Sequence, residues 1–178
     1  DDFWLNEGFT VYFERRIMEA LKGESYANML SILGHQDLTH TLDELGHDHK
    51  DTHLKLDLGM RNPDDGLTDI AYEKGYFFLR SLESYFGREK WDAFLKNYFN
   101  THAFKTMTTK DFCDYMKTTL EIDEKSWKEA GIEAWIYSPG VPENGISVLS
   151  DRFDKVDEAS LEWQKTKQAV PLAFISKA

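Results

Sequence analysis

The chain has 178 residues, a formal net charge of −11, and 41% hydrophobic and 14% aromatic residues. Its apolar content argues against disorder, and its negative charge argues against a nucleic acid partner, because phosphate backbones are bound through lysine and arginine. No apolar run reaches the roughly 18 residues that a membrane-spanning helix needs, so we expect no membrane span.

The first predicted element is a helix over residues 4–21, with apolar residues at helical spacing and Gly23 as its C-terminal stop. Glu7 lies near the head of this apolar run, where a carboxylate is costly unless it is hydrogen-bonded, paired or bound to a cation. From the residues alone, two interpretations remain. Glu7 and Glu14 form a solvated acidic edge, which the spacing favours, or Glu7 is a metal-binding or catalytic carboxylate.

A second helix is expected over residues 25–45, ended by Gly46, followed by a polar connection over 47–67. We expect a short strand at 54–58 and a turn at 62–66 in this connection. Its start holds three histidines and two aspartates, a set that can bind a transition metal: His47, Asp48, His49, Asp51 and His53. A solvated loop is favoured, because the stretch has no apolar frame and Lys50 would repel a cation.

The remaining chain predicts a helix from about residue 68–71 to 86, ended by Gly87, and helices at 89–100, 109–120 and 125–137. Thr108 or Thr109 is expected to cap the 109–120 helix, with Asp111 in its first turn. Cys113, the only cysteine, is expected to be a buried thiol. Two prolines and two glycines over 138–145 indicate a linker. We therefore expect a helical domain over 1–139, a linker over 140–149, and the start of a C-terminal helical domain over 150–178.

Three segments carry a resemblance to a known family. Residues 2–12 (DFWLNEGFTVY) resemble the segment with the third zinc ligand in the aminopeptidase N and leukotriene A-4 hydrolase family of zinc metallopeptidases. Residues 71–75 (AYEKG) resemble the segment with that family's catalytic tyrosine. Residues 134–142 (AWIYSPGVP) resemble the end of the catalytic domain in the leukotriene A-4 hydrolase branch. The resemblance implies a mostly α-helical fragment, the helical lobe of a thermolysin-like catalytic domain.

The resemblance implies roles for particular residues. Glu7 matches the glutamate ligand of a single zinc ion, and Tyr72 matches the tyrosine that donates to the oxyanion as a zinc-activated water attacks the peptide. Without the resemblance, Tyr72 would be interpreted as a packing residue. Asn6 would hold the local backbone, and Glu14 would be an acceptor for a metal-bound histidine or a surface acid.

Asp64 matches an acid that recognises peptide substrates in the leukotriene A-4 hydrolase branch, and it is equally well interpreted as a turn former beside Pro63. Between this acid and the catalytic residue, that branch has a second tyrosine, but the matching position here is Leu67. The departure puts epoxide-hydrolase activity in doubt and affects peptide hydrolysis less.

The two histidine ligands and the general base of the family lie in an upstream H-E-x-x-H motif, which this chain does not contain. The chain therefore looks like a fragment of a zinc aminopeptidase, and we expect it to be inactive alone. The expected partners are a peptide substrate and the upstream half of the catalytic domain, and exposed apolar surface predicts self-association.

Two rival hypotheses remain. One is a non-catalytic helical binding module, and the other is a hydrolase that uses the loop from His47 to His53 as its metal site. The residues 1–4 carry no signal-peptide pattern, and the compartment is unknown, with the cytoplasm slightly favoured.

Overall fold

The computed structural model describes residues 2–142, 145, 148 and 151–168, and every regular element within them is helical. This confirms the predicted mostly α fold class. The α-helices are α1 (Trp4–Lys22), α2 (Glu24–Leu45), α3 (Gly75–Phe86), α4 (Arg88–His102), α5 (Thr109–Thr119), α6 (Glu124–Glu129), α7 (Ile132–Tyr137) and α8 (Asp151–Thr166). Two 3₁₀-helices (Lys50–Thr52 and Pro63–Gly66) and a π-helix (Ile70–Lys74) complete the set. No helix of the described residues combines the length and apolar character needed to cross a membrane.

The chain forms two compact units, one of Asp1–Phe13 with His35–Ile146 and one of Glu14–Gly34 with Ser147–Ala178. In the second unit, α8 confirms the helix predicted after residue 150, and Arg152 lies 5.2 Å from the ring centre of Tyr26. The predicted domain boundaries stay a prediction. Within the predicted linker, residues 143–144, 146–147 and 149–150 lie outside the described residues, as do residues 169–178 of the predicted C-terminal domain.

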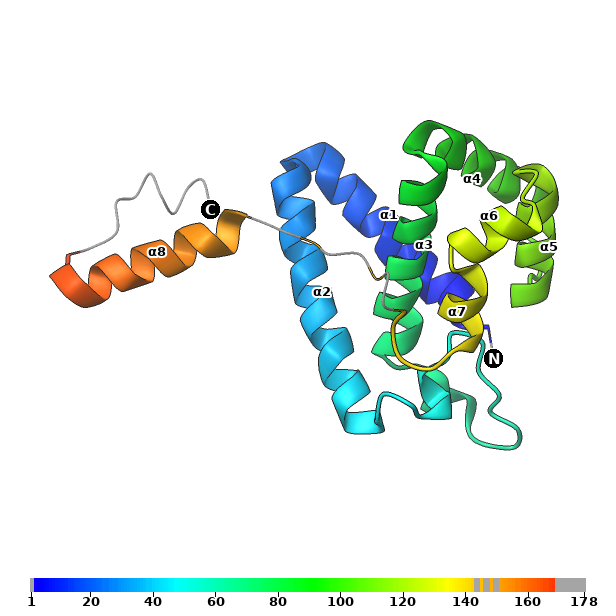
Figure 1. Cartoon of the computed structure of the whole chain (residues 1–178), viewed down its shortest axis with the longest axis horizontal. Coiled ribbons are helices and arrows are strands. Elements are labelled where there is room, and N and C mark those ends of the chain that lie inside the picture. The colour runs from blue at the N-terminus through cyan, green and yellow to red at the C-terminus, as the bar shows by residue number, and fades with distance from the viewer. Residues whose placement is uncertain (1, 143–144, 146–147, 149–150, 169–178) are drawn as a thin grey trace. The chain divides into compact units, whose positions relative to one another are not determined.

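The core of the first unit is aromatic and is centred on α3, which has α4 as its neighbour (Figure 1). Trp4, at the start of α1, is fully buried, and its ring meets those of Phe78 at 5.4 Å and Phe112 at 5.6 Å in edge-to-face geometry. Such pairs add to the free energy gained from burial alone. Trp4 therefore fixes the start of α1 against both α3 and α5.

The predicted ends of the helices are confirmed. Gly23, Gly46 and Gly87 all have positive φ angles, between +81° and +91°, at the ends of α1, α2 and α3. Thr108 caps α5: its hydroxyl accepts from the Asp111 amide, and the Asp111 carboxylate accepts from the Thr108 amide. Cys113 is buried as predicted, and burial raises the pKa of its thiol to about 12.

Two predicted elements are wrong. The helix predicted over 125–137 is two short helices, because Gly131 adopts a left-handed φ of +65° between α6 and α7. The segment predicted as a strand over 54–58 is irregular: residues 54–55 lie in a bend, and residues 56–58 have no regular structure. Its leucines at 54, 56 and 58 are buried by alternation, but Lys55 donates a single backbone hydrogen bond, to Ile136. The alternating pattern of leucines therefore indicates that these side chains are buried, and it does not indicate that the segment pairs with another strand.

Gly8 of α1 and Gly75 of α3 bring two backbones into contact. A Cβ atom on Gly8 would lie 2.9 Å from two backbone atoms of Gly75, and a Cβ on Gly75 would lie 2.9 Å from the Gly8 Cα. Real Cβ atoms essentially never come this close to backbone, so any larger residue would push the two helices apart. The crossing explains why each of the two family-like segments contains a glycine.

We expect Gly75→Ala to destabilise the chain by about 1–3 kcal/mol, because the added methyl overpacks a backbone contact. An exposed helical glycine would instead gain stability from the same change. Urea unfolding followed by circular dichroism measures the difference. Ser84→Ala, at an exposed position of α3, is the control and should stay within about 0.5 kcal/mol of the parent. A Gly75→Ala variant as stable as the parent would contradict the close crossing.

Candidate active site

Glu7 lies in the first turn of α1, and the start of this helix is tied to two other segments. The Asp2 carboxylate accepts from the Thr109 amide at 2.9 Å and from the Lys55 ammonium at 3.1 Å. Trp4 Nε1 donates to the Thr109 hydroxyl at 2.9 Å. Burial opposes ionisation of Asp2, but the hydrogen bonds from Thr109 and Lys55 outweigh it and lower the pKa of this carboxyl. The position of Glu7 is thereby fixed by its neighbours in the same segment.

Tyr72 lies in the π-helix Ile70–Lys74, where the Gly75 amide donates to the Ile70 carbonyl five residues earlier. Such π segments are rare and are frequent at functional sites. The Tyr72 hydroxyl lies near the Glu7 carboxylate, close enough for that carboxylate to affect its titration. Burial, the nearby Glu7 carboxylate and the charge of Asp69 raise the pKa of Tyr72. The hydroxyl therefore keeps its proton at neutral pH and is available as a donor.

The structure thus brings together Glu7 and Tyr72, two of the residues singled out from the sequence. Their contact follows from the Gly8–Gly75 crossing, since Glu7 precedes Gly8 and Tyr72 is three residues before Gly75. Asn6 and Glu14 are exposed. Asn6 lines a hollow of about 410 Å³ together with residues of the α4–α5 connection, among them Phe104 and Lys105. The supporting roles predicted for Asn6 and Glu14 stay predictions.

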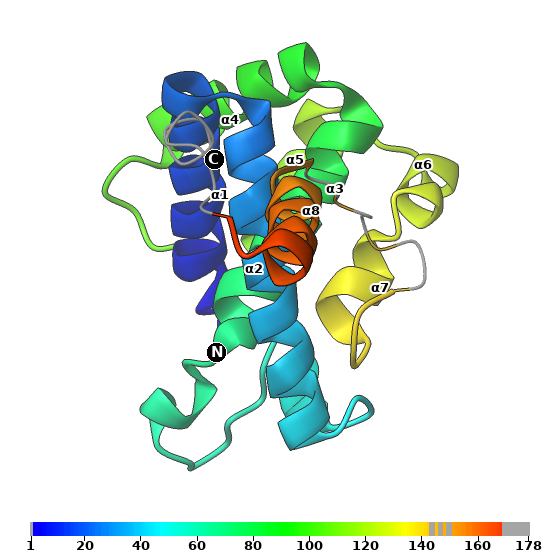
Figure 2. The same cartoon turned by 90° about the vertical axis from the view of Figure 1, so that its left-hand side faces the viewer.

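Asp64 is exposed in the 3₁₀-helix Pro63–Gly66. Its amide donates to the Asn62 side chain at 3.2 Å, as expected for a turn former. The connection that carries Asp64 lies at one end of the helices in both views (Figures 1 and 2). Its role in recognising peptides stays a prediction.

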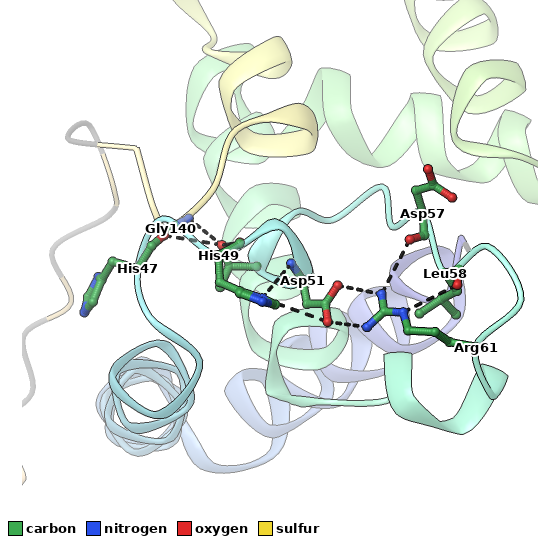
Figure 3. A network of polar contacts seen from close by, with 8 residues as sticks. His47, His49, Asp51, Asp57, Leu58, Arg61 and Gly140 are labelled. Atoms are coloured by element: carbon green, nitrogen blue, oxygen red, sulfur yellow. Dashed lines mark hydrogen bonds and ion pairs between the residues drawn. The ribbon is translucent and has the colours of Figure 1, made fainter.

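The histidines of the 47–53 loop have separate partners. His47 pairs with Asp43 at 2.8 Å, and the His49 ring accepts from the Asp51 amide at 3.2 Å. Asp51 is engaged by Arg61 through two hydrogen bonds of 2.6 Å, and the His47 ring points away from His49 (Figure 3). Among the described residues, no group of three or more histidine, cysteine, aspartate or glutamate side chains gathers into a metal site.

Lys74 is a residue whose importance the sequence did not reveal. It is fully buried, and its ammonium donates to the carbonyls of Thr52 at 2.7 Å and Ser138 at 2.9 Å. Burial lowers the pKa of Lys74 to about 7. The only signal in the sequence is a lysine followed at once by an apolar helical run, and many surface lysines share it.

Known proteins with similar sequences show which family this chain belongs to. The sequence profile of the Peptidase family M1 domain matches residues 1–134. Leucine aminopeptidase 2 of Aspergillus terreus is 37% identical over 173 residues, which are 95% of this chain and 28% of that protein. A leukotriene A-4 hydrolase homolog of Botryotinia fuckeliana is 39% identical over 145 residues, 80% of this chain and 22% of that protein. The chain thus spans under a third of the curated relatives that it matches.

Solved structures of similar proteins have the same fold as this chain. Native leukotriene A4 hydrolase from Saccharomyces cerevisiae superposes with a TM-score of 0.84 at 30% identity, covering 95% of this chain and 27% of that one. An M1 zinc metallopeptidase from Deinococcus radiodurans, at 21% identity and a TM-score of 0.61 over 83% of this chain and 30% of that one, shares the fold. The fold and the paired segments are those of a metallopeptidase helical lobe. The chain belongs to peptidase family M1, and the resemblance to its leukotriene A-4 hydrolase branch is confirmed.

The lowered pKa of Lys74 predicts a pH dependence of stability. Between pH 7 and pH 10.5, the ordinary value for lysine, the unfolded chain binds more protons at this residue than the folded chain does, so the stability of the fold rises with pH. From pH 7 to pH 9 the parent should gain about 2 kcal/mol more in unfolding free energy than Lys74→Met. Urea unfolding at both pH values measures this difference.

In that comparison, the titrations of Cys113 and Tyr98 are common to both proteins and cancel. Lys96→Met, at an exposed lysine of α4, is the control and should keep the parent's pH dependence. Equal pH dependence in the parent and Lys74→Met would show that the Lys74 ammonium is solvated in the folded chain.

Proposed function

We propose that this chain is the C-terminal helical part of the catalytic domain of a zinc aminopeptidase, which removes N-terminal residues from peptides. The observation that carries the proposal is the close approach of Tyr72 and Glu7 beside the Gly8–Gly75 crossing. It joins, at one point in space, the two segments that resemble the family's zinc-ligand and catalytic-tyrosine segments. A binding module without catalysis has no need for this pair.

The residues present fit one part of a zinc site. Glu7 offers a carboxylate oxygen, a ligand that zinc accepts alongside two histidines in hydrolases, and it is only half-buried. We propose that the other ligands come from the upstream H-E-x-x-H segment, as the family resemblance implies. Zinc, when bound, supplies activation of the attacking water and polarisation of the carbonyl.

Tyr72 supplies the oxyanion donor in this proposal. Its raised pKa keeps the phenolic proton in place at neutral pH, so the hydroxyl is able to donate to the oxygen that gains negative charge as the peptide carbonyl is attacked. A preorganised donor of this kind stabilises a transition state by about 3 kcal/mol. The close helix crossing favours such preorganisation, because it limits the movement of the segment that carries Tyr72.

Asp64 is proposed to contact the peptide substrate, and Leu67 bears on the choice of substrate. Leu67 is 41% exposed, directly after the Pro63–Gly66 turn. It offers no hydroxyl where the leukotriene A-4 hydrolase branch has its second tyrosine. We therefore propose peptide hydrolysis and no epoxide hydrolysis for the parent enzyme.

The upstream half of the catalytic domain is the proposed partner of this chain. Apolar side chains of α1, of α4 and of the connection after α4 are exposed: Phe13 at 36%, Phe99 at 44% and Phe104 at 110%. The Phe13 and Phe99 rings are 5.5 Å apart and so form a joint apolar surface. In the chain on its own, this surface supports the expectation of self-association.

Zinc content and aminopeptidase activity test the proposal, with the chain expressed together with the upstream segment that supplies the H-E-x-x-H helix. Glu7→Ala should lose zinc and activity. Tyr72→Phe should keep zinc and lose about 10²–10³-fold in kcat, because it removes a single oxyanion donor. Tyr85→Phe, which removes only a hydroxyl that bonds to Glu129 on the surface, should keep full activity.

The chain without the upstream segment should be inactive. If it binds zinc stoichiometrically and cleaves substrates, and if the Glu7→Ala and Tyr72→Phe variants stay active, the assignment of the site is wrong.

Asp64→Asn should raise KM for short peptides roughly tenfold, the cost of weakening one contact to a charged group, and leave kcat nearly unchanged. Asp65→Asn is the matched control, because Asp65 is an equally exposed acid in the same turn. Steady-state kinetics with unblocked tripeptides measure both variants. The same rise in KM for both variants would point to a general effect of charge and would remove the specific role of Asp64.

A further inference from the structure

Lys74 has an unusual environment for a cation. It has no exposed surface, and both of its hydrogen-bond acceptors in the described residues are backbone carbonyls, those of Thr52 and Ser138. Burying an ammonium is costly, and an apolar side chain would fill the same space at lower cost. Unlike an apolar side chain, the ammonium forms directional hydrogen bonds. These bonds hold two separate carbonyls in fixed positions beside the π-helix that carries Tyr72.

The carbonyl of Thr52 belongs to a tightly held loop. Thr52 is itself fully buried, and its hydroxyl donates to the His49 carbonyl at 2.7 Å and accepts from the Gly140 amide at 2.9 Å. The preceding residue, Asp51, holds both Nη1 and Nη2 of Arg61 at 2.6 Å (Figure 3). Paired contacts of this geometry restrict orientation as well as distance.

Arg61 leads directly into the turn that carries Asp64. Asn62 caps the 3₁₀-helix Pro63–Gly66 and accepts from the Asp64 amide. At the other end of the turn, a Cβ on Gly66 would lie 2.9 Å from the Phe3 ring and from Leu56. Phe3 directly precedes Trp4, the first residue of α1. The turn is therefore held on one side by Arg61 and on the other by the start of the helix that carries Glu7.

We propose that Lys74 is a positioning residue, which sets the place of the Asp64 turn relative to Tyr72 through Thr52, Asp51 and Arg61. These contacts close a ring of residues that runs from Tyr72 through Lys74, the 51–66 connection and Phe3 to Glu7, and back to Tyr72. The inference rests on the proposed function, because it concerns the residues that would bind and polarise a peptide. In this arrangement the buried Lys74 ammonium fixes the distance between Asp64, which would recognise the peptide, and Tyr72, which would polarise it.

Hydrogen exchange of the chain itself is the first test, because it does not depend on activity. Arg61→Gln and Lys74→Met should each speed amide exchange over residues 62–67 by roughly five- to tenfold, the effect of losing about one hydrogen bond, while α5 stays unchanged. Arg88→Gln is the control, because Arg88 pairs with Glu83 outside the ring. Arg61 lies on the protein surface, so its variant remains informative if Lys74→Met fails to fold.

Kinetics with the co-expressed upstream segment give the second test. Arg61→Gln should raise KM roughly tenfold with kcat nearly unchanged, and it should add little in an Asp64→Asn background, because both changes act on the same contact. A merely structural role would lower the active fraction and leave KM as it is.

The outcomes separate this inference from the proposed function. Unchanged exchange over residues 62–67 in Arg61→Gln and Lys74→Met overturns the ring, and additive effects on KM overturn its action through Asp64. Full activity of Tyr72→Phe overturns the proposed function instead. If Asp64→Asn leaves KM unchanged, the role of Asp64 fails, and hydrogen exchange alone decides whether Lys74 positions the turn.

Discussion

The contact between Gly8 and Gly75 is the constraint on which the rest of this site depends. Two helices can cross backbone to backbone only where neither has a side chain at the crossing, and this crossing brings Glu7 close to Tyr72. The anchoring of α1 by Asp2 and Trp4 serves the same end, since a helix that slides along its neighbour would lose the register of the two glycines. Each family-like segment thus combines a functional side chain with the residues that place it.

The connection over residues 47–67 is held in place by side-chain contacts and not by a helix crossing. Residues 47–67 have little regular structure, yet they pack three leucines into the core and bind Lys74 and Asp2 through polar contacts. The Arg61–Asp51 pair links two parts of the connection to each other. A loop keeps a fixed position when its polar groups form hydrogen bonds with the surrounding helices. This loop is paired both with the π-helix and with the start of α1, so it belongs to the site as much as the helices do.

Much of the fold could be predicted from local signals. Apolar periodicity marked the long helices, and glycines marked their ends, because these are properties of neighbouring residues. Gly131 gives no clear signal of a break because apolar residues flank it, and the alternating leucines predict a strand because burial and strand pairing produce the same pattern. Lys74 was missed for another reason. Its role depends on carbonyls of Thr52 and Ser138, distant in sequence, which no local pattern reveals.

The π-helix Ile70–Lys74 opens the helix that α3 continues, and its turn is wider than a regular one. An α-helix rotates by about 100° for each residue. Removing a single residue between Tyr72 and Gly75 would leave a regular helix and turn the phenol away from Glu7, with Glu7 and Tyr72 both still present. The meeting of these two groups is therefore encoded in chain length as well as in residue identity, and sequence drift here should tolerate exchanges more readily than deletions.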